Sequence, residues 1–359
     1  MENGKLILVI NPGSTSTKVA VFRDKAELSS ETLEHSQEEL RRFPAVVDQL
    51  EFRKEAVRRY IDERGLRIGD FSAIAARGGV IGALESGAYL VDELFAHASR
   101  TTHVPHAANL ASVIGYELVK ESGADIPTFV YDAVCGCGKP EEIFTLTGMA
   151  AMERPFLTHV LNTRAVSIRQ AEEDGVPLAE TIYIVVHMGG GVTTNLVCGG
   201  KITDIVADDE GGFSPERSGG VPCRKLVRMC YSGKYTETEM QRMLKGEGGM
   251  LSYLGTSDLR RVEEMIAGGS RRAEIVYQAM AMQLSKDICS LAAVVCGKVD
   301  KIILTGGLAY SEKFTGLLRE RTGFLAPVSV IPGSMEMQAL AFGALRVLNG
   351  EEAYHTFRG

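Results

Sequence analysis

The chain has 359 residues, 45% of them hydrophobic and 24% charged, and it carries a formal net charge of −7 at pH 7. This length and composition predict a globular protein of two domains with ample chain for a large core. The negative charge argues against nucleic-acid binding, and no apolar run is long enough to span a bilayer.

The first predicted element is a hairpin at 5–22, KLILVINPGSTSTKVAVF, in which two apolar runs flank a polar turn. The turn gathers the amide of Asn11, the hydroxyls of Ser14 and Ser16, and the ammonium of Lys18. Backbone amides, hydroxyls and one cation can together surround a phosphoryl group. A polar surface turn is the simpler interpretation of one such hairpin, but the pattern recurs later in the chain, which favours phosphate binding.

Apolar residues at three- and four-residue spacing predict an amphipathic helix within 36–64. A strand at 71–76 then runs into Arg77, and the two glycines that follow leave room for its guanidinium to enter a cleft. A surface arginine beside a turn fits the same pattern equally well. His103 and His106 come next, without the spacing of metal ligands.

An apolar run at 128–133 delivers Asp132 at its end. A carboxylate at the C-terminal end of a strand is a common place for chemistry in α/β folds, although capping of a turn is the structural alternative. The segment 150–169 is predicted to be helical and to carry the chain from one lobe to the other.

The strand–turn–strand pattern recurs at 181–205, where an apolar run leads into His187 and a glycine-rich turn. Gly189, Gly190 and Gly191 have no Cβ, so backbone amides can approach a bound anion closely. The chain contains neither GxxxxGK[ST] nor a well-placed GxGxxG, so the phosphate hypothesis does not rest on those motifs.

A long Gly- and Pro-rich loop at 208–222 carries Arg217, and loops of this length inside a domain are often functional. A further strand ends at Gly306 and Gly307. The remaining helices are predicted at 226–249, 257–268, 274–296, around 317–321, and at 335–348. One hairpin in each half and a late strand–Gly–Gly–helix predict two related lobes around a nucleotide cleft.

At this point the motifs resemble those of the acetate and butyrate kinases, within the superfamily of acetate and sugar kinases, heat-shock-70 proteins and actin. NPGSTSTK is similar to the first phosphate motif of that family, HMGGG at His187 to its second, and LTGGLA at Leu304 to its adenosine motif. Four more motifs follow in the family's order: ARGG at Arg77, VPHAAN at Pro105, VYDA at Asp132 and ERSGG at Arg217. The details of NPGSTSTK, HMGGG and SPERSGG resemble the butyrate kinases more than the acetate kinases.

The resemblance implies an α/β fold of two ribonuclease-H-like, actin-like ATPase lobes, each with a mixed sheet. Residues 1–155 and about 340–359 are expected to form the N-terminal lobe, and 156–339 the C-terminal lobe. The last helix is expected to cross back and pack on the first lobe.

The implied activity is reversible, ATP-dependent phosphorylation of a short-chain carboxylic acid, butyrate or isobutyrate first, to its acyl phosphate by direct in-line transfer. ATP or ADP and Mg²⁺ are the implied cofactors, and a cytoplasmic homo-oligomer without nucleic-acid or membrane partners is expected. The alternatives are an acetate or branched-chain acid kinase, or a nucleotide-switched interaction protein of the actin or heat-shock-70 type. The sequence leaves the acyl-chain preference, the physiological direction and the oligomeric state open.

The resemblance also implies roles for single residues. Arg77 and His106 would bind the substrate acid, and Arg217 and His187 would act on the transferred phosphoryl group. Asp132 would orient the magnesium shell, because a carboxylate substrate is already ionised and needs no general base. The residues expected to bind the nucleotide and its phosphates are Asn11, Ser14, Ser16, Lys18, Gly189, Gly190, Gly191, Gly306 and Gly307.

One departure from the family concerns the metal. Acetate kinases carry a glutamate just after the late Gly-Gly turn that contributes to the magnesium site. Here Leu308, Ala309 and Tyr310 follow that turn and Glu312 is displaced, so this contact is not carried over. The residue that replaces it is left open by the sequence.

Overall fold

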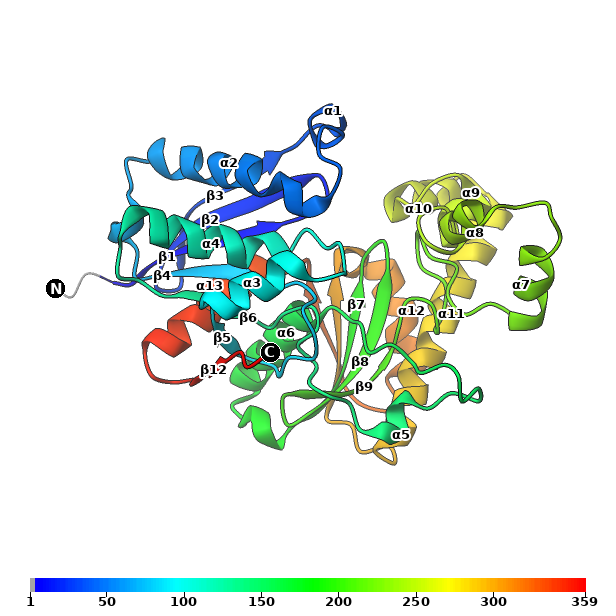
Figure 1. Cartoon of the computed structure of the whole chain (residues 1–359). Helices are drawn as coiled ribbons and strands as arrows, with labels where there is room; N and C mark the ends of the chain where they lie inside the picture. The colour runs from blue at the N-terminus through cyan, green and yellow to red at the C-terminus, as the bar shows by residue number, and fades with distance from the viewer. Residues whose placement is uncertain (1–3) are drawn as a thin grey trace. The chain divides into compact units, whose positions relative to one another are not determined.

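The computed structural model describes residues 4–359, which divide into two compact units (Figure 1). Unit 1 comprises Met1–Lys139 and Met335–Gly359, and unit 2 comprises Pro140–Ser334. The lobe boundaries expected from the sequence were 155/156 and about 339/340. Within residues 4–359, no helix combines the length and the apolar character needed to cross a membrane.

Unit 1 is built on a seven-stranded mixed sheet in the order β12-β5-β6-β4-β1-β2-β3. The predicted first hairpin is confirmed: β1 and β2 pair in antiparallel register, with Ile10 opposite Val19 and Asn11 opposite Lys18. The strands of this sheet are β1 (Leu6–Pro12), β2 (Ser16–Arg23), β3 (Ala26–Glu34), β4 (Ala73–Arg77), β5 (Ala88–Leu90), β6 (Thr128–Tyr131) and β12 (Tyr354–Thr356).

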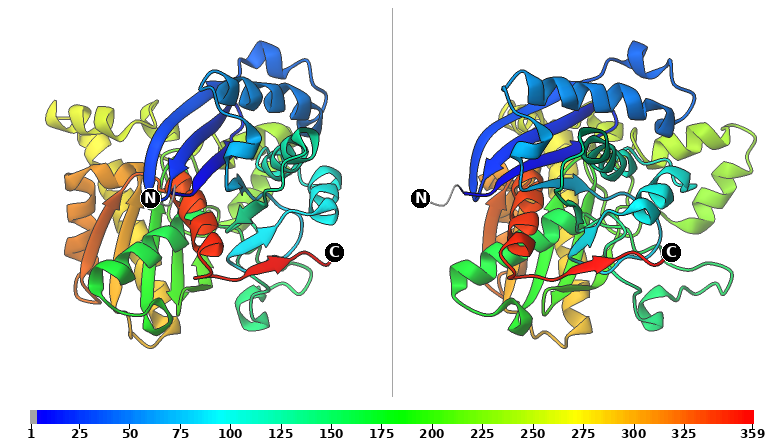
Figure 2. Two further views of the ribbon diagram at one scale, coloured as in Figure 1. Left: turned by 90° about the vertical axis from the view of Figure 1, so that its left-hand side faces the viewer. Right: turned by 60° about the vertical axis from the view of Figure 1, so that its left-hand side comes forward.

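Helices cover both faces of this sheet. Leu8 and Ile10 pack in one core cluster with apolar residues of α4, whereas Phe22 contacts Phe342 of α13 edge to face on the other side. The predicted return of the last helix is confirmed, since α13 packs against β1, β4 and β6 (Figure 2). The helices of unit 1 are α1 (Gln37–Leu40), η1 (Val46–Gln49), α2 (Leu50–Asp62), η2 (Ile68–Asp70), α3 (Glu93–Thr101), α4 (Asn109–Ser122) and α13 (Glu336–Leu348).

Unit 2 repeats the same topology on a five-stranded mixed sheet, β11-β10-β7-β8-β9. β7, β8 and β9 form an antiparallel meander, and β10 pairs in parallel with β7. In unit 1, β4 pairs with β1 in the same way. The predicted second hairpin is therefore confirmed as well. These strands are β7 (Ile182–Met188), β8 (Val192–Cys198), β9 (Lys201–Val206), β10 (Lys301–Gly306) and β11 (Val328–Pro332).

Alternation along β7 separates the two faces of the second sheet. Ile184, Val186 and Met188 join the core under the long helix α11, while His187 points to the opposite face, where α6 packs. The helices of unit 2 are α5 (Glu142–Thr145), α6 (Val160–Asp174), η3 (Leu178–Glu180), α7 (Cys223–Cys230), α8 (Glu237–Leu244), α9 (Gly249–Leu254), α10 (Leu259–Ala267), α11 (Arg271–Val294), η4 (Gly307–Tyr310) and α12 (Glu312–Thr322).

Several predicted helix limits are wrong. The segment 150–169 is helical only from Val160, and 226–249 divides into α7, α8 and the start of α9. The breaks fall where Gly233, Gly246 and Gly249 adopt positive φ, a conformation that ends a helix. The helix predicted at 257–268 begins at Leu259, because Asp258 is its N-cap and accepts the N–H of Arg260.

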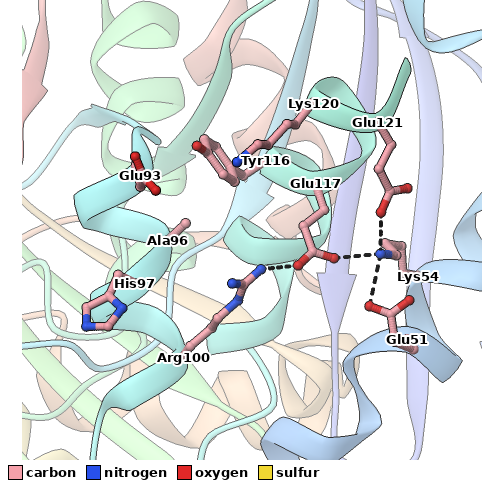
Figure 3. Close-up of a pocket in the computed structure, with 10 residues that line it drawn as sticks. All are labelled: Glu51, Lys54, Glu93, Ala96, His97, Arg100, Tyr116, Glu117, Lys120 and Glu121. Atoms are coloured by element: carbon pink, nitrogen blue, oxygen red, sulfur yellow. Dashed lines mark hydrogen bonds and ion pairs between the residues drawn. The ribbon is translucent and has the colours of Figure 1, made fainter. Parts of the chain in front are cut away.

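A groove of about 450 Å³ on unit 1 holds a buried lysine (Figure 3). Lys54 of α2 is 3% exposed, and its ammonium donates to Glu51 at 3.0 Å and to Glu117 and Glu121 of α4 at 2.6 Å each. Arg100 of α3 pairs with the other oxygen of Glu117. One cation thus joins α2 to α4.

Lys54→Met is expected to lower the free energy of unfolding by roughly 2–3 kcal/mol, because Glu117 and Glu121 lose the cation that they share. Hydrogen exchange of the α2 amides measures this loss. The exposed Lys120→Met, which removes a contact with the Tyr116 ring in the same groove, is the matched control. Equal effects of the two changes would contradict a role for the buried ammonium.

The pH dependence of this contribution follows from two pKa shifts. Burial opposes the charged ammonium, but the hydrogen bonds of Glu117, Glu121 and Glu51 outweigh it and raise the pKa of Lys54. Its stabilisation is therefore complete at neutral pH and is lost as the pH rises through that raised pKa. The hydrogen bond from Lys54 lowers the pKa of Glu121. The stabilisation contributed by the Glu121 carboxylate is therefore lost as the pH falls through this lowered pKa.

Candidate active site

Three predicted site residues of unit 1 lie at the carboxyl ends of adjacent parallel strands. β1 pairs with β4, and β4 with β6, both in parallel register, with Ile10 opposite Ala76 and Arg77 opposite Tyr131. Asn11, Arg77 and Asp132 therefore leave the sheet at one edge. This is the edge of an α/β sheet at which ligands bind.

Arg77 is held by a carboxylate that comes from the far end of the chain. Its Nη1 lies 2.8 Å from Oε1 of Glu336, and Nδ2 of Asn11 donates to the other oxygen of Glu336 at 2.9 Å. The side chain of Arg77 is 12% exposed, and its buried Nε has no hydrogen-bond partner among the described residues. A guanidinium with an unused N–H in a confined place is suited to an anionic oxygen ligand.

Glu336 is a site residue that the sequence did not single out. It lies in the first turn of α13, outside every motif quoted for the family. The sequence shows only a glutamate that follows a Pro-Gly turn and opens the last helix. Without the fold, this pattern does not indicate a site residue. The helix returns to unit 1, and this return brings the glutamate to Arg77 and Asn11.

Asp132 occupies a strained position just past β6. Its φ is 44°, in the left-handed region that is uncommon for a residue with a side chain, and it is 1% exposed. Its N–H donates to the carbonyl of Gly87 at 3.0 Å, and its Oδ1 accepts the N–H of Gly87 at 2.8 Å. Strained backbone of this kind clusters at functional sites, where the surroundings enforce it.

The RGG segment and the VPHAAN segment are joined through Asn109. Its Oδ1 accepts the N–H of Val80 at 2.7 Å, and its Nδ2 donates to the carbonyl of Val104 at 2.9 Å. A Cβ at Gly79 would lie 1.8 Å from that Oδ1, so glycine is required there. His106 is exposed in the tethered loop, and its Nδ1 accepts the N–H of Ala108 at 3.2 Å.

The turn of the first phosphate motif projects from the sheet. Gly13, Ser14 and Thr15 are exposed, Ser16 is half-buried, and Gly13 N–H closes the turn on the Ser16 carbonyl at 2.8 Å. The Lys18 side chain is exposed and makes no ion pair within residues 4–359. Ser14 and Lys18 are therefore accessible and Ser16 is partly so, whereas Asn11 is buried and donates to Glu336.

In unit 2, the protonation of His187 is fixed by its neighbours. Thr305 donates its hydroxyl to the carbonyl of Gly333 at 3.2 Å, so its oxygen accepts the amide N–H of Asn162, also at 3.2 Å. The same amide nitrogen of Asn162 lies 2.9 Å from Nδ1 of His187. An amide nitrogen can only donate, so Nδ1 is the acceptor and the ring proton lies on Nε2.

Asn162→Leu is expected to lower kcat roughly tenfold to a hundredfold with little change in KM, because the imidazole loses the partner that fixes its proton on Nε2. Steady-state kinetics of the single and double variants with His187→Ala measure this. In the His187→Ala background the same substitution is expected to cost little. Additive losses would show that Asn162 acts independently of His187.

A second histidine lies against the first. The rings of His159 and His187 stack with centroids 3.9 Å apart and an angle of 12° between their planes. Nδ1 of His159 lies 3.0 Å from the hydroxyl of Thr193 on β8. No pattern in the sequence marks His159, which precedes α6 in a segment that was predicted to be helical.

The structure brings Arg217 to the glycine turn of the second phosphate motif. A Cβ on Gly191 would lie 3.3 Å from Oδ2 of Asp208 and 3.7 Å from Nε of Arg217. Arg217 Nε donates to Asp208 Oδ2 at 3.2 Å, and Nη1 donates to the carbonyl of Glu216 at 3.3 Å. These bonds orient the guanidinium and leave Nη2 without a hydrogen bond among the described residues.

The loop that carries Arg217 is fastened on both sides. Ser214 Oγ donates to the carbonyl of Gly190 at 2.7 Å, and the N–H of Gly212 donates to Asp287 of α11 at 2.7 Å. Burial raises the pKa of Asp287 to about 6. This carboxylate is therefore ionised at neutral pH, when it accepts the loop amide most strongly.

The Gly306–Gly307 turn lies next to the end of β7, the strand that leads into the second phosphate motif. Gly306 has a φ of 90°, and a Cβ there would lie 2.4 Å from the carbonyl oxygen of Met188. Gly306 and Gly333 exchange two backbone hydrogen bonds, of 2.9 and 3.0 Å. In unit 2, His187, the glycine turn, Arg217 and the Gly306–Gly307 turn thus form one continuous cluster.

Comparisons with known proteins agree with this arrangement. The profile of the acetokinase family matches residues 154–317. The chain is 41% identical over 348 residues to a probable butyrate kinase 2 of Caldanaerobacter subterraneus subsp. tengcongensis, covering 96% of this chain and 98% of that protein.

Two solved structures share the fold. An acetate kinase from Porphyromonas gingivalis gives a TM-score of 0.80 at 19% identity, over 96% of this chain and 100% of that one. A propionate kinase from Francisella tularensis subsp. tularensis gives 0.76 at 17% identity, over 94% and 98% of the two chains. The expected fold class is confirmed by these likenesses.

Proposed function

The chain belongs to the acetokinase family, and on that premise we propose that it transfers the γ-phosphoryl group of ATP to a short-chain fatty acid, butyrate first. The product is the acyl phosphate, and the reaction is reversible. The observation that carries this proposal is the Arg77–Glu336–Asn11 cluster at the carboxyl edge of the unit 1 sheet. It offers a guanidinium that can bind a carboxylate in a charge-assisted pair.

Arg77 binds the substrate carboxylate in this proposal, with His106 in the tethered loop beside it. A fatty acid is ionised at neutral pH, so its oxygen can attack the γ-phosphorus without a base. What limits the attack is repulsion from the phosphate oxygens and loss of alignment. A guanidinium that neutralises and orients the carboxylate removes both obstacles.

Arg217 and His187 act on the phosphoryl group. The Nε2–H of His187 donates a hydrogen bond to a phosphoryl oxygen, and Arg217 stabilises the charge that spreads over these oxygens during transfer. The turns at Gly189–Gly191 and Gly306–Gly307 let backbone amides approach the nucleotide. Ser14, Ser16 and Lys18 of the first phosphate motif bind phosphate oxygens.

The donor chemistry of unit 1 fits magnesium. Among residues 4–359 no cluster of three or more metal-binding side chains occurs, but Mg²⁺ commonly takes only one or two protein carboxylates and fills its shell with water and phosphate oxygens. Asp132 and Glu336 are the carboxylates that would hold it. The ion would neutralise phosphate charge when bound.

Trapping the product with hydroxylamine tests the proposal. Purified protein with MgATP and acetate, propionate, butyrate or isobutyrate is expected to yield acyl hydroxamate, most with butyrate or isobutyrate. A maximum at acetate would keep the mechanism and change the substrate. No hydroxamate with any acid, from protein that still binds ATP, would refute a carboxylate kinase and favour a nucleotide-switched interaction protein.

The setting of the enzyme is part of the same proposal. We propose that the enzyme is cytoplasmic and that it assembles into a homo-oligomer, a dimer or higher, as the family resemblance implies. Sedimentation of the purified protein measures the assembly state.

A further inference from the structure

A fully buried arginine lies beneath the turn of the first phosphate motif. Arg53 is 0% exposed, and it projects from α2, which packs against β2 (Figure 1). Its Nη1 donates to the carbonyls of Gly13 at 3.0 Å and Ser16 at 2.9 Å, and its Nη2 donates to the carbonyl of Ser14 at 3.0 Å.

The side chain of Arg53 is itself fixed. Its Nε donates to Oε1 of Gln49 one turn earlier in the chain at 3.0 Å, and Nη1 also donates to the hydroxyl of Thr17 at 3.1 Å. That hydroxyl lies 2.9 Å from Nε2 of His35. Five hydrogen bonds therefore hold one guanidinium in one orientation.

No carboxylate compensates this charge within the part of the chain that the structure describes. Every acceptor of Arg53 is a neutral carbonyl, amide or hydroxyl oxygen. Burial lowers the pKa of Arg53 to about 10, so the group is charged at neutral pH. Buried charges are ordinarily paired, and an unpaired cation under a polar loop leaves a positive field at the surface above it.

The hydrogen bonds also set the direction of the backbone amides. In a trans peptide the carbonyl of one residue and the N–H of the next point in opposite directions. Because the carbonyls of Gly13 and Ser14 point to Arg53, the N–H groups of Ser14 and Thr15 point away from it. The carbonyl of Thr15 accepts the N–H of His35 at 2.8 Å, so it is not free to point outward.

Both residues with outward N–H groups, Ser14 and Thr15, are exposed. Successive amides that point outward from a turn, above a buried cation, form an anion-binding surface. A turn that served only to join two strands would not need a buried guanidinium to hold its carbonyls inward.

We propose that Arg53 is the positioning residue of the first phosphate motif: it aims the amides of Ser14 and Thr15 at a nucleotide phosphate and supplies positive charge beneath them. This inference rests on the proposed function. Arg53 touches no substrate atom and acts through the turn.

Arg53→Lys tests the inference, because lysine keeps the charge but cannot reach three carbonyls with a planar fork. The KM for MgATP, and the Kd for MgADP measured by calorimetry, are expected to rise about tenfold or more, since charge-assisted hydrogen bonds are lost. The KM for butyrate is expected to change less than about twofold, because Arg77 is untouched. A merely structural role would not separate the two substrates in this way.

Gln49→Leu gives a milder test if Arg53→Lys folds poorly. It leaves the guanidinium in place and removes its Nε partner, so a smaller shift in the same direction is expected. Lys54→Met is the matched control: it changes the next residue of α2, destabilises the unit and contacts nothing in the turn, so nucleotide affinity should survive.

Nucleotide affinity within twofold of the parent in a folded Arg53→Lys protein would overturn the inference. So would equal losses for MgATP and butyrate. The proposed function fails separately, through the absence of hydroxamate from the unaltered protein, and the MgADP measurement tests Arg53 even then.

Discussion

Arg217→Ala is expected to lower kcat by about three to five orders of magnitude while MgATP still binds within a few-fold of its normal affinity. Asp208 and Glu216 hold the guanidinium against Gly191, at the turn of the second phosphate motif. In that position it would stabilise the charge that develops on the phosphoryl oxygens, and such an interaction is strongest in the transition state. Single-turnover measurement of acyl phosphate formation, with calorimetry for MgATP, separates the two quantities.

Two variants sharpen this test. Arg217→Lys keeps a positive charge without the planar fork and is expected to recover only part of the rate. Arg242→Ala removes an exposed arginine of the same unit that pairs with Glu247, and it should leave kcat unchanged. A near-native turnover for Arg217→Ala would contradict its assignment to the transferred group.

Arg77→Ala is expected to raise the KM for butyrate by about a hundredfold or more and to lower kcat as well. The guanidinium would hold the attacking carboxylate, so its loss removes both binding and alignment. It also leaves the carboxylate of Glu336 without its partner at 2.8 Å, next to the reacting anion. The affinity for MgADP should change little, and steady-state kinetics with butyrate and calorimetry with MgADP measure both effects.

A matched control exists in the same unit. Arg100→Ala removes a partly exposed arginine whose partner, Glu117, belongs to the groove at α2, α3 and α4. It is expected to leave both kinetic constants within about twofold, as for a surface pair. If Arg77→Ala raised the KM for ATP and spared that for butyrate, the arginine would belong to the nucleotide instead.

The strands and their turns could be predicted because their signals are local. The hairpins around Asn11 and Gly189 combine apolar runs with a polar or glycine turn, and both form as expected. The helix limits between Cys223 and Leu254 could not be predicted, because glycines with positive φ break a stretch that still carries apolar residues at helical spacing. The spacing of apolar residues alone does not reveal such breaks.

The site divides in the same way. Arg77, Asp132, His187 and Arg217 stand beside glycines or at strand ends, where a sequence pattern can mark them. Residues that act through tertiary contacts are not marked by any local sequence pattern. Glu336 reaches Arg77 only because α13 returns to unit 1, and Asn162 reaches His187 only because α6 packs on β7.

Arg53 shows the same limitation from within a helix that was predicted. Arg53 lies on a predicted amphipathic helix, where charged residues ordinarily face solvent, yet its side chain is fully buried. The carbonyls that it binds belong to a turn 37 to 40 residues earlier in the chain. Hydrogen bonds over such a separation cannot be inferred from periodicity.

The central claim is that a carboxylate oxygen attacks the γ-phosphorus of ATP. Butyrate labelled with ¹⁸O at both carboxyl oxygens, incubated with the protein, MgATP and hydroxylamine, tests it directly by mass spectrometry of the released phosphate. Hydroxylamine attacks the acyl carbon, so phosphate that carries one ¹⁸O per molecule is the predicted result. Unlabelled phosphate would contradict the claim, because it would mean that butyrate does not attack the γ-phosphorus. Label in AMP would also contradict it, because it would mean that butyrate attacks the α-phosphorus.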